Sequence, residues 1–235
     1  MKPKIDLIVS INVHEKPEYL QTQIININDH IKVEKKIILN VNEHMHNELF
    51  QKEFHDTVLN PTIINKRTYH GSLTHGIISN MKLALEQFDF EYFLVMSSRE
   101  FFYNPLNDIG EIKNHEDFLG QPISKRKDYN TNEWAFPKFR RDTKFFKFIE
   151  KNEMYFSNSA HEGVCFTKET CEYIVSFMSE NPEIETDTYT AEHCLEEFVC
   201  QSLAINSKTG TFYYIGNGCC GEPINPNKLT LKRGR

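Results

Sequence analysis

The stretch IDLIVSINVHEKPEYLQTQIININDHI, residues 5–31, decides the fold class. Residues 5–13 form an apolar run of the length of a buried strand. Pro17 then opens a segment whose apolar residues recur at helical spacing, and proline is favoured in the first turn of a helix. A strand followed at once by a helix predicts a βα unit.

Further segments extend this alternation. The pattern predicts strands at 35–42, 61–65 and 91–98, and helices at 46–54 and 72–88. In the last helix Leu73, Ile77 and Met81 share one face, and Ser72 suits the N-cap. Strands that alternate with helices of this length form a parallel sheet with right-handed crossovers. The predicted fold class is therefore α/β, with a Rossmann-type, mostly parallel sheet and helices on both faces.

The pattern is less regular after residue 104. It predicts a long loop at 121–139, helices at 140–151, 168–180 and 190–205, and strands at 163–167 and 211–215. We interpret the chain as one domain, 1–235. Its parts are a first half at 1–104, a second half at 105–216 and a basic, turn-rich tail at 217–235.

Composition and charge exclude several classes of protein. The 235 residues are 39% hydrophobic and carry a net charge of -6, which is typical of a globular protein and disfavours a general nucleic-acid binder. No apolar run approaches the ~20 residues that span a bilayer. We expect reduced thiols in the cytoplasm, because a chain of this length needs no disulfides and the cysteines all fall in the last third. The six are Cys165, Cys171, Cys194, Cys200, Cys219 and Cys220.

Several common catalytic motifs are absent. The chain contains no GxGxxG after the first strand, no GxxxxGK[ST], no HExxH and no GxSxG. It also lacks a DxD pair that would hold a divalent ion on a diphosphate. His44 and His46 have no third ligand at suitable spacing, so no metal or other cofactor is expected.

The segment EHCLEEFVCQSL, residues 192–203, brings carboxylates into an apolar stretch. At helical spacing, Glu192 and Glu196 fall on one face, which we assign to solvent. Glu197 lies near the boundary of the apolar face. A carboxylate that is partly desolvated there has the property that a general base needs.

Four segments together resemble the core-2/I-branching β-N-acetylglucosaminyltransferases, a GT-A group that works without a metal. They are LIVSINVHEKPEYL (7–20), KKIILNVNEH (35–44), RTYHGSLTHGIISNMKLALEQFDFEYFLVMSSREFFYNP (67–105) and LEEFVCQSL (195–203). The resemblance implies a GT-A-like fold and inverting transfer of a sugar, from a UDP-sugar to a glycan hydroxyl. Short members occur in bacteria and viruses, which implies the cytoplasm of a bacterium or of a virus-infected cell.

The resemblance also implies roles for residues. Glu196 and Glu197 match the acidic pair of the family's late helix, whose glutamate deprotonates the acceptor, so Glu197 is expected to be the base. The first half would bind the nucleotide-sugar and the second half the acceptor. Lysine or arginine would stabilise the leaving diphosphate in place of a metal.

Candidate ligands of the donor follow from the places where strands end. The turns after the first two strands hold Val13, His14, Asn40 and Asn42, which can contact uracil and ribose. The start of the helix at Ser72 is a possible anion site, although a plain N-cap explains this serine equally well. The candidate cations for the diphosphate are Arg67, Lys228, Lys232 and Arg233, and a solvated basic tail is the alternative for the last three.

Candidate ligands of the acceptor are Ser98, Glu100, Trp134 and Glu162. Ser98 and Glu100 match the family's turn after the fourth strand, and Trp134 offers a surface for stacking on a sugar unless it belongs to the core. His161 and Glu162 precede a predicted strand and can line the same cleft.

Two rival functions stay open. One is a non-catalytic protein of the same fold that binds sugar-nucleotides or glycans. The other is a metal-dependent GT-A transferase, in which Glu100 or Asp89 replaces the missing acidic pair.

Overall fold

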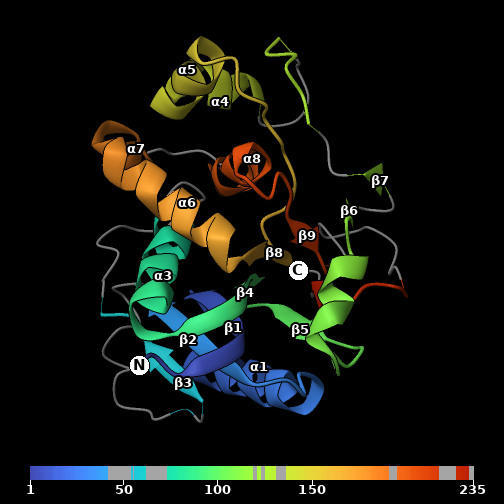
Figure 1. The fold of residues 1–235 in the computed structure, drawn as a ribbon. Helices are drawn as coiled ribbons and strands as arrows, with labels where there is room; N and C mark the ends of the chain where they lie inside the picture. Colours follow the sequence, from blue (N-terminus) through green and yellow to red (C-terminus); the bar gives the residue numbers. More distant parts are fainter. Residues whose placement is uncertain are drawn as a thin grey trace.

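A computed structural model describes most of the chain as an α/β fold (Figure 1). A six-stranded, mixed but mostly parallel sheet is flanked by helices, which confirms the fold class predicted from the sequence. The described residues are 1–41, 54, 56–61, 73–118, 121–122, 125–130, 136–190, 195–216 and 226–232.

The order of strands in the sheet is β3-β2-β1-β4-β8-β9. The first four strands of this order run parallel, while β8 and β9 are each antiparallel to the preceding neighbour. The order of the chain reverses between β1 and β4. The strands are β1 (Lys4–Val13), β2 (Lys35–Val41), β3 (Thr57–Leu59), β4 (Asp89–Ser97), β8 (Val164–Thr167) and β9 (Tyr213–Tyr214).

Two smaller pairs of strands and several helices complete the fold. β5 (Glu100–Phe102) pairs with β10 (Thr230–Lys232), and β6 (Asp117–Phe118) pairs with β7 (Gln121–Pro122). The helices are α1 (Pro17–His30), α3 (Leu73–Gln87), α4 (Phe136–Asp142), α5 (Lys144–Lys151), α6 (Lys168–Glu180), α7 (Pro182–Thr190) and α8 (Val199–Asn206). Two 3-10 turns are η2 (Ile109–Asn114) and η3 (Leu195–Glu197).

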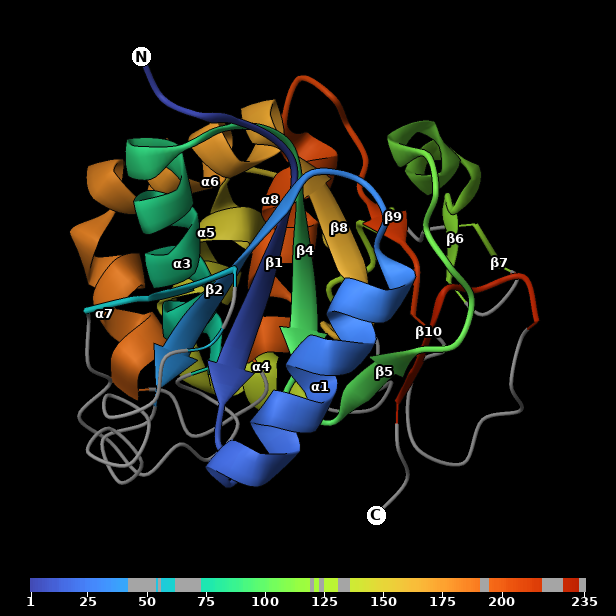
Figure 2. The ribbon, with the colours of Figure 1, turned by 90° about the horizontal axis from the view of Figure 1, so that it is seen from below.

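Alternation of side chains along β1 builds a core on each face of the sheet. Leu7, Val9 and Ile11 belong to one buried cluster with residues of α1, whereas Ile8 belongs to a second cluster with residues of α3. Figure 2 shows α1 on one face, with α3 and α6 on the other. Both faces are therefore buried, as the continuous apolar strands of the sequence predict.

Two expectations about elements need correction. The predicted helix at 190–205 is interrupted, because the structure has α7, then η3, then α8. The strand next to β2 is Thr57–Leu59, whereas the strand predicted at 61–65 lies outside the described residues except for Pro61. The predicted loop at 121–139 contains β7 and the start of α4. The predicted helix at 46–54 lies outside the described residues except for its last one.

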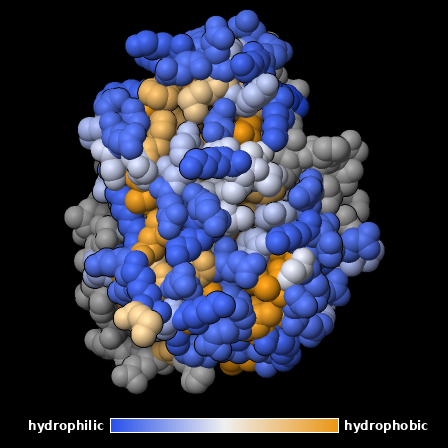
Figure 3. Space-filling view, viewed as in Figure 1, coloured by the Kyte–Doolittle hydropathy of each residue, from blue (hydrophilic) through white to orange (hydrophobic). Residues whose placement is uncertain are grey.

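The surface drawn is mostly hydrophilic and the described cysteines are buried, as expected for a chain that packs its apolar side chains in a core. Figure 3 shows mostly hydrophilic side chains on the face drawn, with apolar ones in narrow bands between them. Within the described ranges, no helix has the length and hydropathy needed to cross a membrane. Cys165, Cys171 and Cys200 are buried free thiols.

Candidate functional site

The candidate site lies at the carboxyl ends of the parallel strands, where β1 and β4 are neighbours. The arrowheads of β1, β2 and β4 point to this one edge (Figure 2). Asn12 is in register with Asn40 of β2 and with Ser97 of β4, so three adjacent strands each carry a polar residue at the last or next-to-last position. Ligands of open α/β sheets bind at this edge, at the point where the strand order reverses.

The turns after β1 and β4 contact each other at this point. The Ser98 hydroxyl lies 3.2 Å from Nδ1 of His14, and Ser98 is buried. The Glu15 carboxylate forms an ion pair with Nε of Arg99 and lies 3.7 Å from Nε2 of His14. Burial lowers the pKa of His14, and the cations of Arg99 and His161 lower it further against the opposing effect of Glu15.

The other side of the site comes from the segment before β8 and from η3. The Gly163 N–H donates to the Val95 carbonyl at 2.8 Å, which docks this segment onto β4. Gly163 has a φ of +82°, and a Cβ there would lie 2.4 Å from the Cα of Gly216. The Ser159 N–H donates to the Glu197 carbonyl at 3.2 Å, which fixes η3 beside the same segment.

These contacts bring one histidine among three buried carboxylates. Nδ1 of His161 lies 3.4 Å from Oε1 of Glu197 and 3.5 Å from Oε2 of Glu162. Burial alone would lower the pKa of His161, but the carboxylates of Glu162, Glu197 and Glu196 raise it to about 10. Burial raises the pKa of Glu196 to about 8, although the His161 cation opposes that shift. The surrounding carboxyl groups therefore favour the protonated, cationic form of His161.

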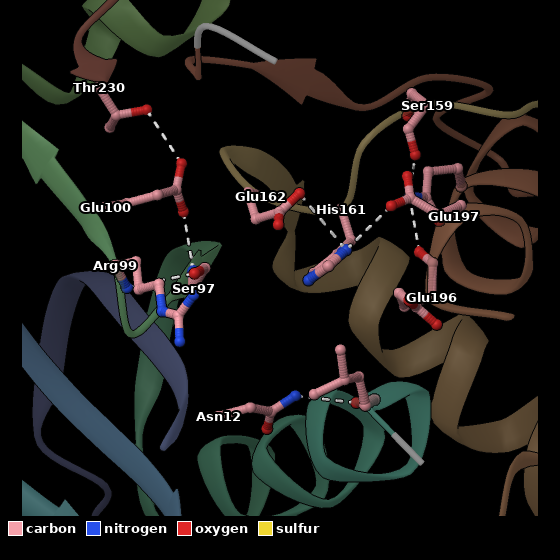
Figure 4. Close-up of polar contacts among 12 residues, drawn as sticks. Asn12, Ser97, Arg99, Glu100, Ser159, His161, Glu162, Glu196, Glu197 and Thr230 are labelled. Carbon is pink, nitrogen blue, oxygen red and sulfur yellow. Dashed lines mark hydrogen bonds and ion pairs between the residues drawn. The ribbon is translucent and has the colours of Figure 1, made fainter. Parts of the chain in front are cut away.

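The two sides face each other. In Figure 4, Ser97 and Arg99 lie on one side, Glu162, Glu197 and Glu196 on the other, and the ring of His161 projects between them. The electrostatic effect of both Arg99 and His161 on His14 is consistent with this arrangement. Positive charge from Arg99 thus lies across from the cluster of carboxylates.

The cluster also has donor atoms that suit a metal ion. His161, Glu196 and Glu197 each offer one ligand atom, and these atoms lie within 4.8 Å of one another. A histidine with carboxylates is a ligand set found for zinc and other transition metals.

Several residues predicted from the sequence lie at this site. Glu197, Glu162, His14 and Ser98 come together as described above, although they are up to 183 positions apart in the sequence. Val13 and Asn40 are buried at the same carboxyl edge. Asn42, Arg67, Ser72, Trp134 and Arg233 lie outside the described residues, as does the side chain of Lys232.

Other predicted residues have structural contacts. The carboxylate of Glu100 accepts from the Ser97 N–H at 2.8 Å and from the Thr230 hydroxyl at 3.4 Å, so it joins the turn after β4 to β10. Lys228 is buried and donates to the Tyr214 carbonyl at 2.8 Å. Asp89 begins β4 at the opposite edge of the sheet, where it pairs with Lys168 at 2.6 Å.

Sequence reasoning missed two residues of the site. It placed Glu196 on a solvated face, but Glu196 is 2% exposed, because the helical register assumed for 190–205 does not hold. It also passed over Arg99. The signal for Arg99 was its position, directly after the two serines that end a buried strand.

Comparison with known sequences does not assign this chain to a family. No protein family and no curated protein sequence matches this chain. Its chemistry is therefore inferred from the geometry of the site and from the sequence.

Proposed function

We propose that this protein is an inverting glycosyltransferase with a GT-A-like fold, similar to the metal-independent core-2/I-branching β-N-acetylglucosaminyltransferases. It transfers a sugar from a nucleotide-sugar, a UDP-sugar by that resemblance, to a hydroxyl of a glycan or glycoconjugate. Glu197 is the general base, and lysine or arginine stabilises the diphosphate.

One observation carries the proposal. The Glu197 carboxylate is buried beside the His161 cation, across from the turns that follow β1 and β4. A nucleotide at the reversal point of the sheet would lie next to His14, with its sugar directed to Glu197. Buried carboxylates at such a position are suited to proton transfer.

The reaction follows from this placement. The acceptor O–H gives its proton to the Glu197 carboxylate while the acceptor oxygen forms a bond to C1 of the donor sugar. The bond between C1 and the phosphate oxygen breaks, and its electron pair stays on the leaving diphosphate. Attack from the face opposite the leaving group inverts the configuration at C1.

The pair Glu197→Gln and Glu196→Gln tests this role, since each variant replaces one carboxyl group of the same turn. We expect UDP release from a panel of UDP-sugars and glycan acceptors to fall ~10²- to 10⁴-fold in Glu197→Gln. Glu196→Gln should retain activity within about tenfold, and both should bind UDP as the wild type does. NMR of the product should show an inverted anomeric centre.

Other outcomes would contradict the proposal. Activity of Glu197→Gln within a few-fold of the wild type would remove Glu197 from the mechanism. Binding of UDP-sugars with no turnover on any acceptor would favour a non-catalytic binding protein.

A metal-dependent transferase is the second candidate, favoured by the ligand atoms of His161, Glu196 and Glu197. In that case His161, Glu196 and Glu197 would hold a divalent ion, which would act as a Lewis acid on the donor. Activity that is lost in EDTA and restored by one divalent metal would support this candidate. We expect activity that survives EDTA.

A further inference from the structure

We propose that Arg99 binds the diphosphate of the donor by exchanging its partner Glu15 for phosphate oxygens. This inference rests on the proposed function. It assigns the stabilisation of the leaving diphosphate to Arg99, a cation that lies at the candidate site.

Arg99 occupies the turn between β4 and β5, at the reversal point of the sheet. Its backbone N–H donates to the Ser97 hydroxyl at 3.2 Å, which fixes the start of the side chain. In the described part of the chain, its guanidinium has one partner, the Glu15 carboxylate, bonded through Nε. The two terminal NH₂ groups of Arg99 therefore remain available to an incoming anion.

The ion pair with Glu15 is suited to exchange. The side chain of Arg99 is 43% exposed, and solvent weakens a pair of this kind. A guanidinium binds two phosphate oxygens at once through parallel N–H donors, and a diphosphate carries more charge than the carboxylate it would replace. Binding of the donor would thus release Glu15 toward His14, whose Nε2 is 3.7 Å away.

The charges of the site define the direction of the donor. Arg99 lies on the side of β1 and β4, and the carboxylates of Glu162 and Glu197 lie on the other side (Figure 4). The two carboxylates outweigh the single positive charge of His161 beside them, so this cluster would repel a diphosphate, whereas Arg99 attracts it. A donor held by Arg99 at its diphosphate would therefore place the sugar between the two sides, toward Glu197. Charge that develops on the phosphate during transfer would then meet a fixed cation.

Isothermal titration with inorganic pyrophosphate, UDP and uridine tests the contact. Arg99→Ala should weaken binding of pyrophosphate and UDP about 10- to 100-fold and leave uridine unchanged. Arg99→Lys should recover part of the loss, because lysine offers a point charge without the fork. Arg141→Ala is the matched control, since it removes the same charge from the exposed last turn of α4.

Glu15→Gln separates exchange from a merely structural role. Removing the competing carboxylate should tighten pyrophosphate binding a few-fold in the wild-type background and have no effect in Arg99→Ala. Equal affinities of Arg99→Ala and Arg141→Ala would overturn the inference and leave the glycosyl-transfer proposal standing on Glu197. A wild type that binds neither pyrophosphate nor UDP would overturn both, whereas Arg99-dependent binding without sugar transfer would overturn the proposed function alone.

Discussion

Nδ1 of His161 lies 3.4 Å from Oε1 of Glu197, although the two residues are 36 positions apart in the sequence. Both side chains are buried, and Glu162 lies on the other side of the same ring nitrogen at 3.5 Å. The imidazolium offsets charge that would otherwise be concentrated in a low dielectric. The stability of the fold and the proposed catalytic role of Glu197 therefore both depend on this histidine.

Replacing His161 with alanine should lower the free energy of unfolding by about 3 kcal/mol, because it leaves buried carboxylates without their cation. Urea denaturation measures this loss. The same substitution should cost less in a Glu197→Gln background, where one of the carboxylates is already neutral. Equal losses in the two backgrounds would show that the ring acts by packing alone.

Alanine at Gly163 should destabilise the fold by about 3 kcal/mol or more, because its Cβ would meet the Cα of Gly216 at 2.4 Å. Gly210 provides the control. It also has a positive φ, of +62°, but a Cβ there would lie 3.7 Å from its nearest neighbour, Nζ of Lys125. Gly210→Ala should therefore cost only about 1 kcal/mol of backbone strain. Thermal or urea denaturation that ranks the two variants equally would contradict the close approach.

His75 should make stability fall in acid. It is 4% exposed, its ring centroid lies 3.5 Å from that of Tyr189, and neither ring nitrogen has a hydrogen-bond partner among the described residues. Burial lowers the pKa of His75 to about 4, against the opposing effect of Glu185. The unfolded chain takes up the proton first, below the ordinary value of 6.5. The stability that depends on a neutral His75 is thus complete above pH 6.5, and it is lost as the pH falls toward 4.

The expected size of this loss is up to about 3 kcal/mol. His75→Phe keeps an aromatic ring beside Tyr189 and cannot titrate, so it is the matched variant. The difference in unfolding free energy between wild type and variant should change by that amount from pH 7 to pH 4. A constant difference over this interval would contradict a neutral, buried His75.

Asn80 joins α3 to β1 and to the residue that follows β3 by buried hydrogen bonds. Its Nδ2 donates to the Ser10 hydroxyl at 2.9 Å, and its Oδ1 accepts from Nδ2 of Asn60 at 2.7 Å. Asn80→Ala should lower stability by about 2 kcal/mol, because it leaves polar partners buried. Asn152→Ala removes an exposed bond to the Phe148 carbonyl and should cost less than about 0.5 kcal/mol. Equal effects in urea denaturation would contradict this account.

The interrupted helix at 190–205 shows why part of the site was not predictable. In a continuous helix the carbonyls of Glu196 and Glu197 would accept bonds from later residues of the same helix. Instead, the Glu196 carbonyl accepts from the side chain of Gln201 at 2.9 Å, and the Glu197 carbonyl accepts from the Ser159 N–H at 3.2 Å. The second partner lies outside the helix. Periodicity reports only local spacing, so it cannot detect such a competitor.

The sequence by itself determined the α/β class and the first strand and helix. It also determined α3 and α6, because apolar spacing and capping residues act within one segment. The sequence also made Glu197 a candidate general base, because Glu196 and Glu197 match the acidic pair of the family that the chain resembles. Only the tertiary structure decided that His161 lies between Glu162 and Glu197, that Glu196 is buried, and that Arg99 faces them. These relationships depend on the order of strands and on contacts between distant segments, and neither is encoded in the spacing of residues along the chain.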